Sequence, residues 1–265
     1  MKHKLLLAAA LLFAAAAAAQ NNAAVLLFDD FDSADATPNP EVWEPCRYEY
    51  SVWARYFNDA LPYAGVRVEN GFLKLSAYKS GGRYVTGGIK TRHGFPVNTR
   101  VDVAAIITKP VKGGFPAIWQ MPVHGKPWPR SGEIDIMEWV HPTEKTVFQT
   151  VHTYYALENT GASATTHPTH NFDVTAEHIY SVVRTETAVT FLIDGQQLWT
   201  YDNLGLGGTE EQLQYPFAEG DFNLILNYSL GGKFNGKMSW PGPVDNSQLP
   251  GEMWINWVSI SALQP

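Results

Sequence analysis

Short β-prone segments follow one another along most of the chain, and this pattern restricts the fold more than any other feature. Gly, Pro, Asn and Asp separate the segments, which is typical of β-sandwiches and jelly rolls. The Asp-Gly pair at 194–195 lies between two apolar runs and predicts a two-residue hairpin. No long helical period appears, so we expect one short helical turn at 209–213 and a loop at 154–171. Examples of the segments expected to be strands are 25–28, 71–77, 100–107, 134–138, 146–152, 179–185, 188–193, 222–230 and 253–260.

The first 19 residues have the pattern of a signal peptide. Lys2 and Lys4 precede an unbroken apolar run at 5–19, which ends in the small residues of a cleavage site before Gln20. This run is short for a membrane span. We therefore expect cleavage, secretion to the periplasm or the extracellular space, and no membrane span. The alternative is a retained membrane anchor.

The rest of the chain, residues 20–265, has a length and composition that suit a single all-β domain. The net charge of the full chain, −7, makes nucleic acid an unfavourable partner. Cys46 is the only cysteine, so an internal disulfide is excluded, and we expect a buried apolar role for it rather than a catalytic thiol. We expect a monomer.

Three acidic residues alternate with apolar ones in residues 128–139. Glu133 and Asp135 are two positions apart, so in a strand both side chains point to the same face. Glu138 would point to the opposite face in a regular strand. One β-bulge near Met137 would return it to the face of the other two.

The spacing of these acids suits glycosidic bond cleavage. Two Glu side chains leaning together from one strand can bring their carboxyls to about 5–5.5 Å, the separation in retaining glycosidases. Asp135 would lie between them and influence their charges. The alternative is a solvent-facing polar strand. Nearby Trp119, Trp128 and Trp139 favour a sugar site, because aromatic faces pack against sugar rings.

The segment Gly132-Glu133-Ile134-Asp135-Ile136-Met137-Glu138 resembles the signature of glycoside hydrolase family 16, in its laminarinase-like branch with the bulge. The resemblance extends over most of the chain. It implies a jelly roll of two curved antiparallel sheets, with the substrate lying across the concave one. It also implies that Glu133 is the nucleophile, that Glu138 is the general acid/base, and that Asp135 assists Glu133. The other matching blocks are Gly87-Gly88-Ile89-Lys90-Thr91, Phe115-Pro116-Ala117-Ile118-Trp119, Tyr215-Pro216-Phe217, and Leu224-Ile225-Leu226-Asn227 followed by Gly231-Gly232.

Several further residues are candidates for substrate binding. The tryptophans are candidates for stacking on sugars, the arginines and the asparagine for binding hydroxyls, and the histidine for an active-site role on the next strand. Core packing, surface positions and structural hydrogen bonds are the alternatives. The wide spacing of the tryptophans along the sequence suggests a groove that is open at both ends. The candidates are Trp119, Trp128, Trp240, His152, Arg92, Arg130 and Asn227.

The resemblance also bears on metal binding. Family members often carry a structural calcium ion, and Asp30 is placed to supply its first acidic ligand. Asn256 stands where the family has a late Asp, and the loss of that charge weakens a site for a hard cation. We therefore expect no cofactor and no catalytic metal.

The resulting hypothesis is a secreted, retaining endo-β-glycosidase that acts on a polysaccharide, with a β-1,3- or β-1,3/1,4-glucan as the first choice. The alternative substrate is poly-N-acetyllactosamine, as in mucin-type glycans, or a marine galactan, which would make the protein an endo-β-galactosidase. A carbohydrate-binding module of lectin type is a non-enzymatic alternative. A third possibility is that Glu133, Asp135, Glu138 and His152 form a metal site.

Overall fold

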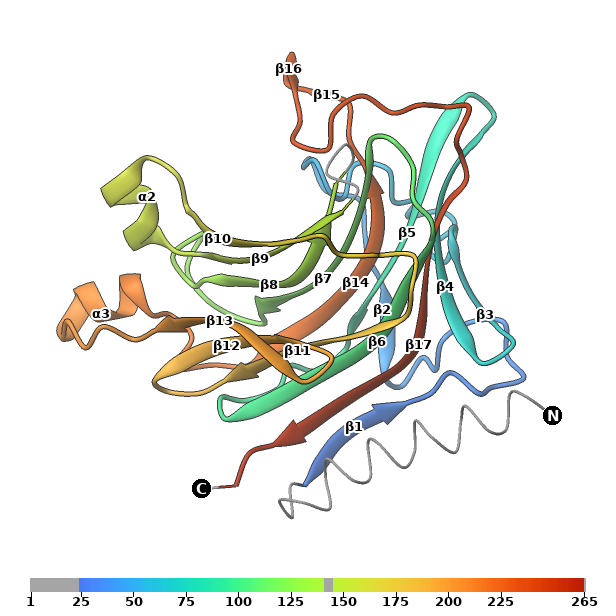
Figure 1. Cartoon of the computed structure of the whole chain (residues 1–265). Coiled ribbons are helices and arrows are strands. Elements are labelled where there is room, and N and C mark those ends of the chain that lie inside the picture. The colour runs from blue at the N-terminus through green and yellow to red at the C-terminus, as the bar shows by residue number, and fades with distance from the viewer. Residues whose placement is uncertain (1–23, 141–144, 265) are drawn as a thin grey trace.

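Two curved antiparallel layers of strands make up the protein (Figure 1). The computed structural model describes residues 24–140 and 145–264, so the expected signal peptide lies outside the described residues. The strands are β1 (Val25–Asp29), β2 (Trp43–Pro45), β3 (Val66–Glu69), β4 (Phe72–Ser80), β5 (Arg83–Thr91), β6 (Thr99–Lys109), β7 (Gly114–Pro122), β8 (Glu133–Trp139), β9 (Thr146–His152), β10 (Ala164–His170), β11 (His178–Arg184), β12 (Ala188–Ile193), β13 (Gln196–Asp202), β14 (Phe222–Leu230), β15 (Lys233–Phe234), β16 (Lys237–Met238) and β17 (Gly251–Ala262).

The concave layer contains the strands in the order β10-β9-β8-β7-β14-β5, with β2 paired to β5. The outer layer contains β4-β17-β6-β11-β12-β13, with β1 paired to β17 and β3 to β4. Pairing of β4 with β5 joins the two layers. This arrangement confirms the predicted sandwich of two antiparallel sheets.

The main hydrophobic core fills the space between the layers. Alternation along β4 buries Leu73 and Leu75, and alternation along β14 buries Leu224 and Leu226 on the face toward them. Each such side chain contributes about 1.5–3 kcal/mol through burial. Because this core holds the sheet from behind, the opposite face of the concave layer is free to carry polar groups.

The prediction for the segment after β9 was wrong. Instead of a loop, the segment forms helix α2 (Tyr154–Thr160) and strand β10. Thr153 caps the helix by accepting a hydrogen bond from the Ala156 backbone, and Gly161 ends it in the left-handed conformation. These two cap residues were the sequence signal for a short helix.

Three smaller predictions are confirmed. The Asp194-Gly195 turn joins β12 to β13. The expected helical turn near residue 209 is helix α3 (Gly208–Gln214). Cys46 is a free, buried residue, and burial raises the pKa of its thiol, which suits a packing role better than a reactive one.

Within residues 24–140 and 145–264, the two helices are each seven residues long, and neither has the length or apolar character needed to cross a membrane.

Candidate active site

Strand β8 carries all three candidate catalytic acids. Between Asp135 and Glu138 its register shifts against β9, because Ile136 and Met137 lie opposite a single residue of that strand. The predicted bulge is therefore present. It turns Glu138 to the same face as Glu133, as the five-residue spacing requires.

The three carboxyls open into one cavity of about 130 Å³ on the concave face. By volume this is room for about four water molecules. Apart from the acids and Asn227, the cavity walls are apolar, so the acids lie in surroundings that disfavour charge. The cavity is lined by Val52, Trp53, Phe115, Ala117, Trp119, Glu133, Asp135, Glu138 and Asn227.

The two glutamates differ in their electrostatic surroundings. Burial, followed by the charges of Asp135 and Glu133, raises the pKa of Glu138 well above 4.5. Burial and Asp135 also raise the pKa of Glu133, to about 8, but the charge of His152 and a hydrogen bond from the Trp128 indole N–H oppose the shift. That hydrogen bond is 2.6 Å long. At Glu138 a hydrogen bond with Thr150 opposes the shift, but no positive charge does. The surroundings therefore favour the ionised form at Glu133 and the protonated form at Glu138.

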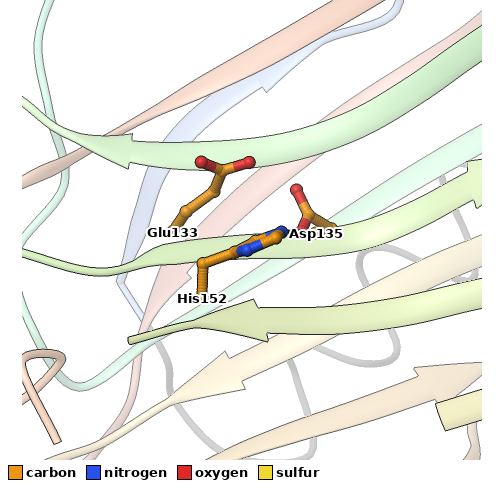
Figure 2. A group of neighbouring side chains, drawn as sticks. All are labelled: Glu133, Asp135 and His152. Carbon is orange, nitrogen blue, oxygen red and sulfur yellow. Dashed lines mark ion pairs between the residues drawn. The ribbon is translucent and has the colours of Figure 1, made fainter. Parts of the chain in front are cut away.

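His152 lies on β9 beside the acids, and Figure 2 shows its imidazole directed toward Asp135. Its Nε2 is 3.3 Å from Oδ2 of Asp135, and its Nδ1 is 2.9 Å from the hydroxyl of Ser163. Burial alone would lower the pKa of His152, but the hydrogen bond and the charge of Asp135, with the charge of Glu133, raise it. The two acids therefore favour the imidazolium form of His152, whose positive charge lies next to the carboxylates.

The same cluster has the spacing of a possible cation site. Ligand atoms of Glu133, Asp135 and His152 lie within 4.8 Å of one another. A carboxylate pair and an imidazole can bind a divalent cation. The metal hypothesis formed from the sequence therefore stays open to a chelation test.

Two predicted sugar-stacking residues are exposed beside the acids. Trp128 is 54% exposed, and its ring centroid is 5.5 Å from that of His152. Trp240 is 52% exposed and packs edge-on against Phe115 at 5.7 Å and Phe148 at 5.2 Å. Phe148 pairs with Glu138, so Trp128 lies at the Glu133 end of the acid row and Trp240 at the Glu138 end.

Trp119 and Asn227 line the bottom of the cavity. Trp119 is only 6% exposed, and its indole N–H donates a 2.7 Å hydrogen bond to Oδ1 of Asn227. The amide of Asn227 donates in turn to the hydroxyl of Ser229. These bonds fix the two side chains, so Trp119 presents a small part of its ring to the cavity rather than an exposed stacking face.

The two arginines lie away from the acid cavity. Arg92 forms an ion pair with Glu44 at 3.6 Å and donates to the carbonyl of Pro40. The guanidinium of Arg130 stacks on Tyr154 of α2, with its carbon 3.4 Å from the ring centroid. Arg130 also lines a separate surface cavity of about 570 Å³ between the β7–β8 loop and α3.

The sequence reasoning missed Trp53 and Ser163. Trp53 belongs to no strand, and nothing in its local sequence indicates contact with Trp119, 66 positions later. Ser163 follows helix α2, in a segment that we expected to be a loop. Trp53 reaches the site through a chain crossing that local periodicity does not encode, whereas Ser163 reaches it through the α2 connection between the neighbouring strands β9 and β10.

The residues considered for calcium have protein partners. The amide of Asn256 donates to Glu177 at 3.0 Å, and Oδ1 of Asp30 accepts from the backbone of Asp32 at 3.2 Å. The expectation about calcium stays a prediction.

Comparisons with known proteins identify relatives over most of the chain. The model of the family described as glycosyl hydrolases family 16 matches residues 60–258. A keratan-sulfate endo-1,4-beta-galactosidase of Sphingobacterium multivorum is 29% identical over 220 residues, which cover 80% of this chain and 49% of that protein. A beta-glucanase of Rhodothermus marinus is 29% identical over 251 residues, which cover 88% of this chain and 82% of that protein. The chain thus spans about half the length of the first relative and most of the second.

A solved structure provides a nearer match. It is described with endo-acting O-glycanases that prominent members of the human gut microbiota express to initiate mucin breakdown. That chain is 48% identical, its TM-score is 0.86, and the match covers 91% of this chain and all of the other. The identity is well above that of either relative named above.

Proposed function

The chain belongs to glycosyl hydrolases family 16, and from this premise we propose that it is an endo-acting β-glycosidase that cleaves with retention of configuration. The observation that carries the proposal is the single cavity shared by Glu133, Asp135 and Glu138. A binding module needs aromatic side chains but has no use for acids buried against one another, because their mutual repulsion costs stability.

The proposed reaction has two steps. The Glu133 carboxylate attacks the anomeric carbon while the Glu138 carboxyl gives its proton to the departing glycosidic oxygen, which leaves the sugar as an ester on Glu133. The Glu138 carboxylate then takes a proton from water, and the resulting hydroxide attacks the same carbon and releases Glu133. The different surroundings of the two glutamates support this assignment of roles.

His152 and Trp128 are proposed to keep Glu133 reactive. The indole N–H donor and the imidazolium charge both favour the ionised form of Glu133. Asp135 links His152 to the acid row and holds negative charge next to Glu138, which favours the proton on the general acid. This division makes one buried carboxyl a nucleophile and its neighbour an acid at the same pH.

For the substrate, we propose a β-galactoside-containing glycan of the poly-N-acetyllactosamine type, which makes the protein an endo-β-galactosidase. The support is the 48% identity to the structure described with O-glycanases, together with the galactosidase relative. A β-glucan, the first choice from the sequence, is the second candidate because of the Rhodothermus marinus relative. Secretion after signal peptide cleavage would bring the enzyme to either polymer.

A panel of polysaccharides tests this proposal. The protein should release oligosaccharides from keratan-type poly-N-acetyllactosamine chains at least ten times faster than from laminarin, lichenan or agarose, with product size read by chromatography. Faster release from laminarin or lichenan would reverse the substrate choice. Binding without release from any polymer would support the lectin-type alternative. Activity that survives a chelator would exclude the metal hypothesis.

Retention is tested by the anomer formed first. If Glu133 is the nucleophile, early product should be the β-anomer, because two inversions at one carbon restore the starting configuration. Proton NMR during the first minutes, before mutarotation, distinguishes the anomers. Early α-anomer would show direct attack by water and would remove Glu133 from its role.

A further inference from the structure

A segment before the first long strands covers part of the concave face. We call residues 46–57 the covering segment. Its apolar side chains form a small second cluster with residues of β7 and β14 on the face that carries the acids, separate from the core between the layers. The buried members of this cluster are Cys46, Ala54, Phe57, Ala117, Trp119 and Ile225.

A glycine in β5 allows the covering segment to approach this strand closely. Gly88 pairs with Asn227, and a Cβ on Gly88 would lie 2.9 Å from the ring of Phe57. The covering segment therefore lies directly on β5, and a substrate cannot occupy this part of the concave face.

The middle of the covering segment borders the catalytic cavity. Val52 and Trp53 line the cavity on its β14 side. The Trp53 ring lies 4.8 Å from that of Trp119, at an interplanar angle of 83°, and its carbonyl accepts a 2.6 Å hydrogen bond from Ser229. Trp53 is thus a fixed aromatic wall next to the acids.

Contacts with the β15–β16 hairpin hold the covering segment from outside. Arg55 donates to the carbonyls of Lys233 and Gly231, and the Tyr50 hydroxyl donates to Oδ1 of Asn235. The ring of Tyr50 also packs on Phe234 at 5.0 Å. The hairpin stands above the concave layer in Figure 1. The wall therefore has support from two separate parts of the chain.

Among the described residues, none from β9 or β10 lines the cavity on its opposite side. Thr166 of β10 faces Thr150 across the strands, with 3.1 Å between their hydroxyls, and Ala164 pairs with His152. Ala164 and Thr166 are both exposed. The concave face thus continues past His152 over the small, exposed side chains of Ala164 and Thr166.

We propose that the substrate groove extends in one direction only. On the β14 side of the cleaved bond, Trp53 blocks the groove, so the last sugar that can bind there is the one in contact with Trp53. On the other side, further sugars bind over β9 and β10. This inference rests on the proposed glycosidase function and names its specificity-determining residue. It replaces the groove open at both ends that the spacing of the tryptophans suggested.

The consequence is a difference in how chain length affects rate. Binding energy from sugars remote from the cleaved bond raises kcat/KM when those sugars have a site. On the β14 side the rise in kcat/KM should end with the sugar that contacts Trp53. On the β9–β10 side each added sugar has further protein surface to bind, so kcat/KM should rise again. Subsite mapping measures both gains with oligosaccharides of the best substrate, extended at either the reducing or the non-reducing end.

We expect kcat/KM to stop rising after about one or two sugars are added toward Trp53, which we call the limited direction. It should keep rising when sugars are added toward β9 and β10. Trp53→Ala should lower kcat/KM about tenfold or more for substrates extended in the limited direction, and reduce the gain from the sugar that touches Trp53. The gains in the other direction should persist. Trp53→Phe keeps an aromatic wall and should retain most of the wild-type dependence of kcat/KM on chain length. It provides the test if Trp53→Ala does not fold.

Arg55→Ala loosens the covering segment without changing the lining of the cavity, and it should weaken only the limited direction. Its matched control is Arg67→Ala, which removes an exposed arginine paired with Glu69 on β3. Equal gains in both directions, or Trp53 variants that affect both directions alike, would overturn the proposal. Absence of cleavage with every glycan would instead reject the proposed function, so the two failures are distinct.

Discussion

Replacing either glutamate should almost abolish turnover, but with different signatures. Glu133→Gln removes the nucleophile, and we expect a loss on the order of 10⁴-fold or more on every substrate. Glu138→Gln removes the proton donor, and we expect a loss of about 10²–10⁴-fold on natural glycans. The aryl alcohol of an aryl glycoside is a good leaving group and departs without a proton from an acid. Formation of the sugar ester on Glu133, the first step, should therefore stay fast with aryl glycosides in the Glu138 variant. A burst of the aryl alcohol, measured in a stopped-flow instrument, would reveal it.

Azide separates the two roles further. In Glu138→Ala, azide can enter the emptied space and attack the sugar ester on Glu133, so it should restore turnover of the aryl glycoside and form a β-glycosyl azide. No β-azide should form with Glu133→Gln, because no sugar ester exists. Glu158→Gln, on the exposed side of α2, is the matched control and should keep wild-type activity. Near-normal turnover by either active-site variant would refute the assignment.

Glu133→Gln should also stabilise the protein at alkaline pH. The folded state raises the pKa of Glu133 from 4.5 to about 8, so the folded protein holds this proton more tightly than the unfolded chain does. The wild type therefore loses stability as pH rises from about 4.5 to 8, because folding then requires a buried charge. Glutamine stays neutral and can still accept the Trp128 hydrogen bond.

The expected gain in the free energy of unfolding of Glu133→Gln over the wild type is about zero near pH 4 and largest above pH 8. The pKa shift of Glu133 corresponds to a stability difference of at most about 5 kcal/mol. Because the other acids of the cluster titrate together with Glu133, we expect a difference of about a few kcal/mol. In a protein of this length, each kcal/mol raises Tm by about 2–4 °C. Calorimetry of the variant and wild type at pH 4, 6 and 8 measures the difference. Equal Tm differences at all three values, or a less stable variant at pH 8, would contradict the pKa shift.

Glu158→Gln is again the control, because it removes one negative charge from an exposed position. Its Tm difference from the wild type should stay small at all three pH values, since an exposed carboxylate keeps its hydration in the folded state. The contrast between the two variants isolates the cost of placing charge in the cavity. Such a cost is typical of catalytic groups, which sacrifice stability for reactivity.

Local patterns in the sequence predicted the acid row because its geometry is local. Alternation along one strand places Glu133 and Asp135 on one face, and the five-residue spacing to Glu138 requires the bulge that the structure contains. The hairpin at Asp194-Gly195 was predictable for the same reason, since two adjacent residues determine the turn. Helix α2 also had local signals, its two caps, which a search for longer helical periods overlooked.

The surroundings of the acids depended on contacts between distant parts of the chain. Trp53 meets Trp119, and Tyr50 meets Asn235, only because strands and loops far apart in sequence cross the same face. Ser163 meets His152 across the shorter α2 connection, 11 positions along the chain. No periodicity records such a crossing. Composition and spacing therefore determined an all-β fold and a row of three acids, whereas the tertiary structure decided which aromatic side chains wall the cavity. It also decided how far each carboxyl is removed from water, because burial and charge crowding are properties of the assembled site.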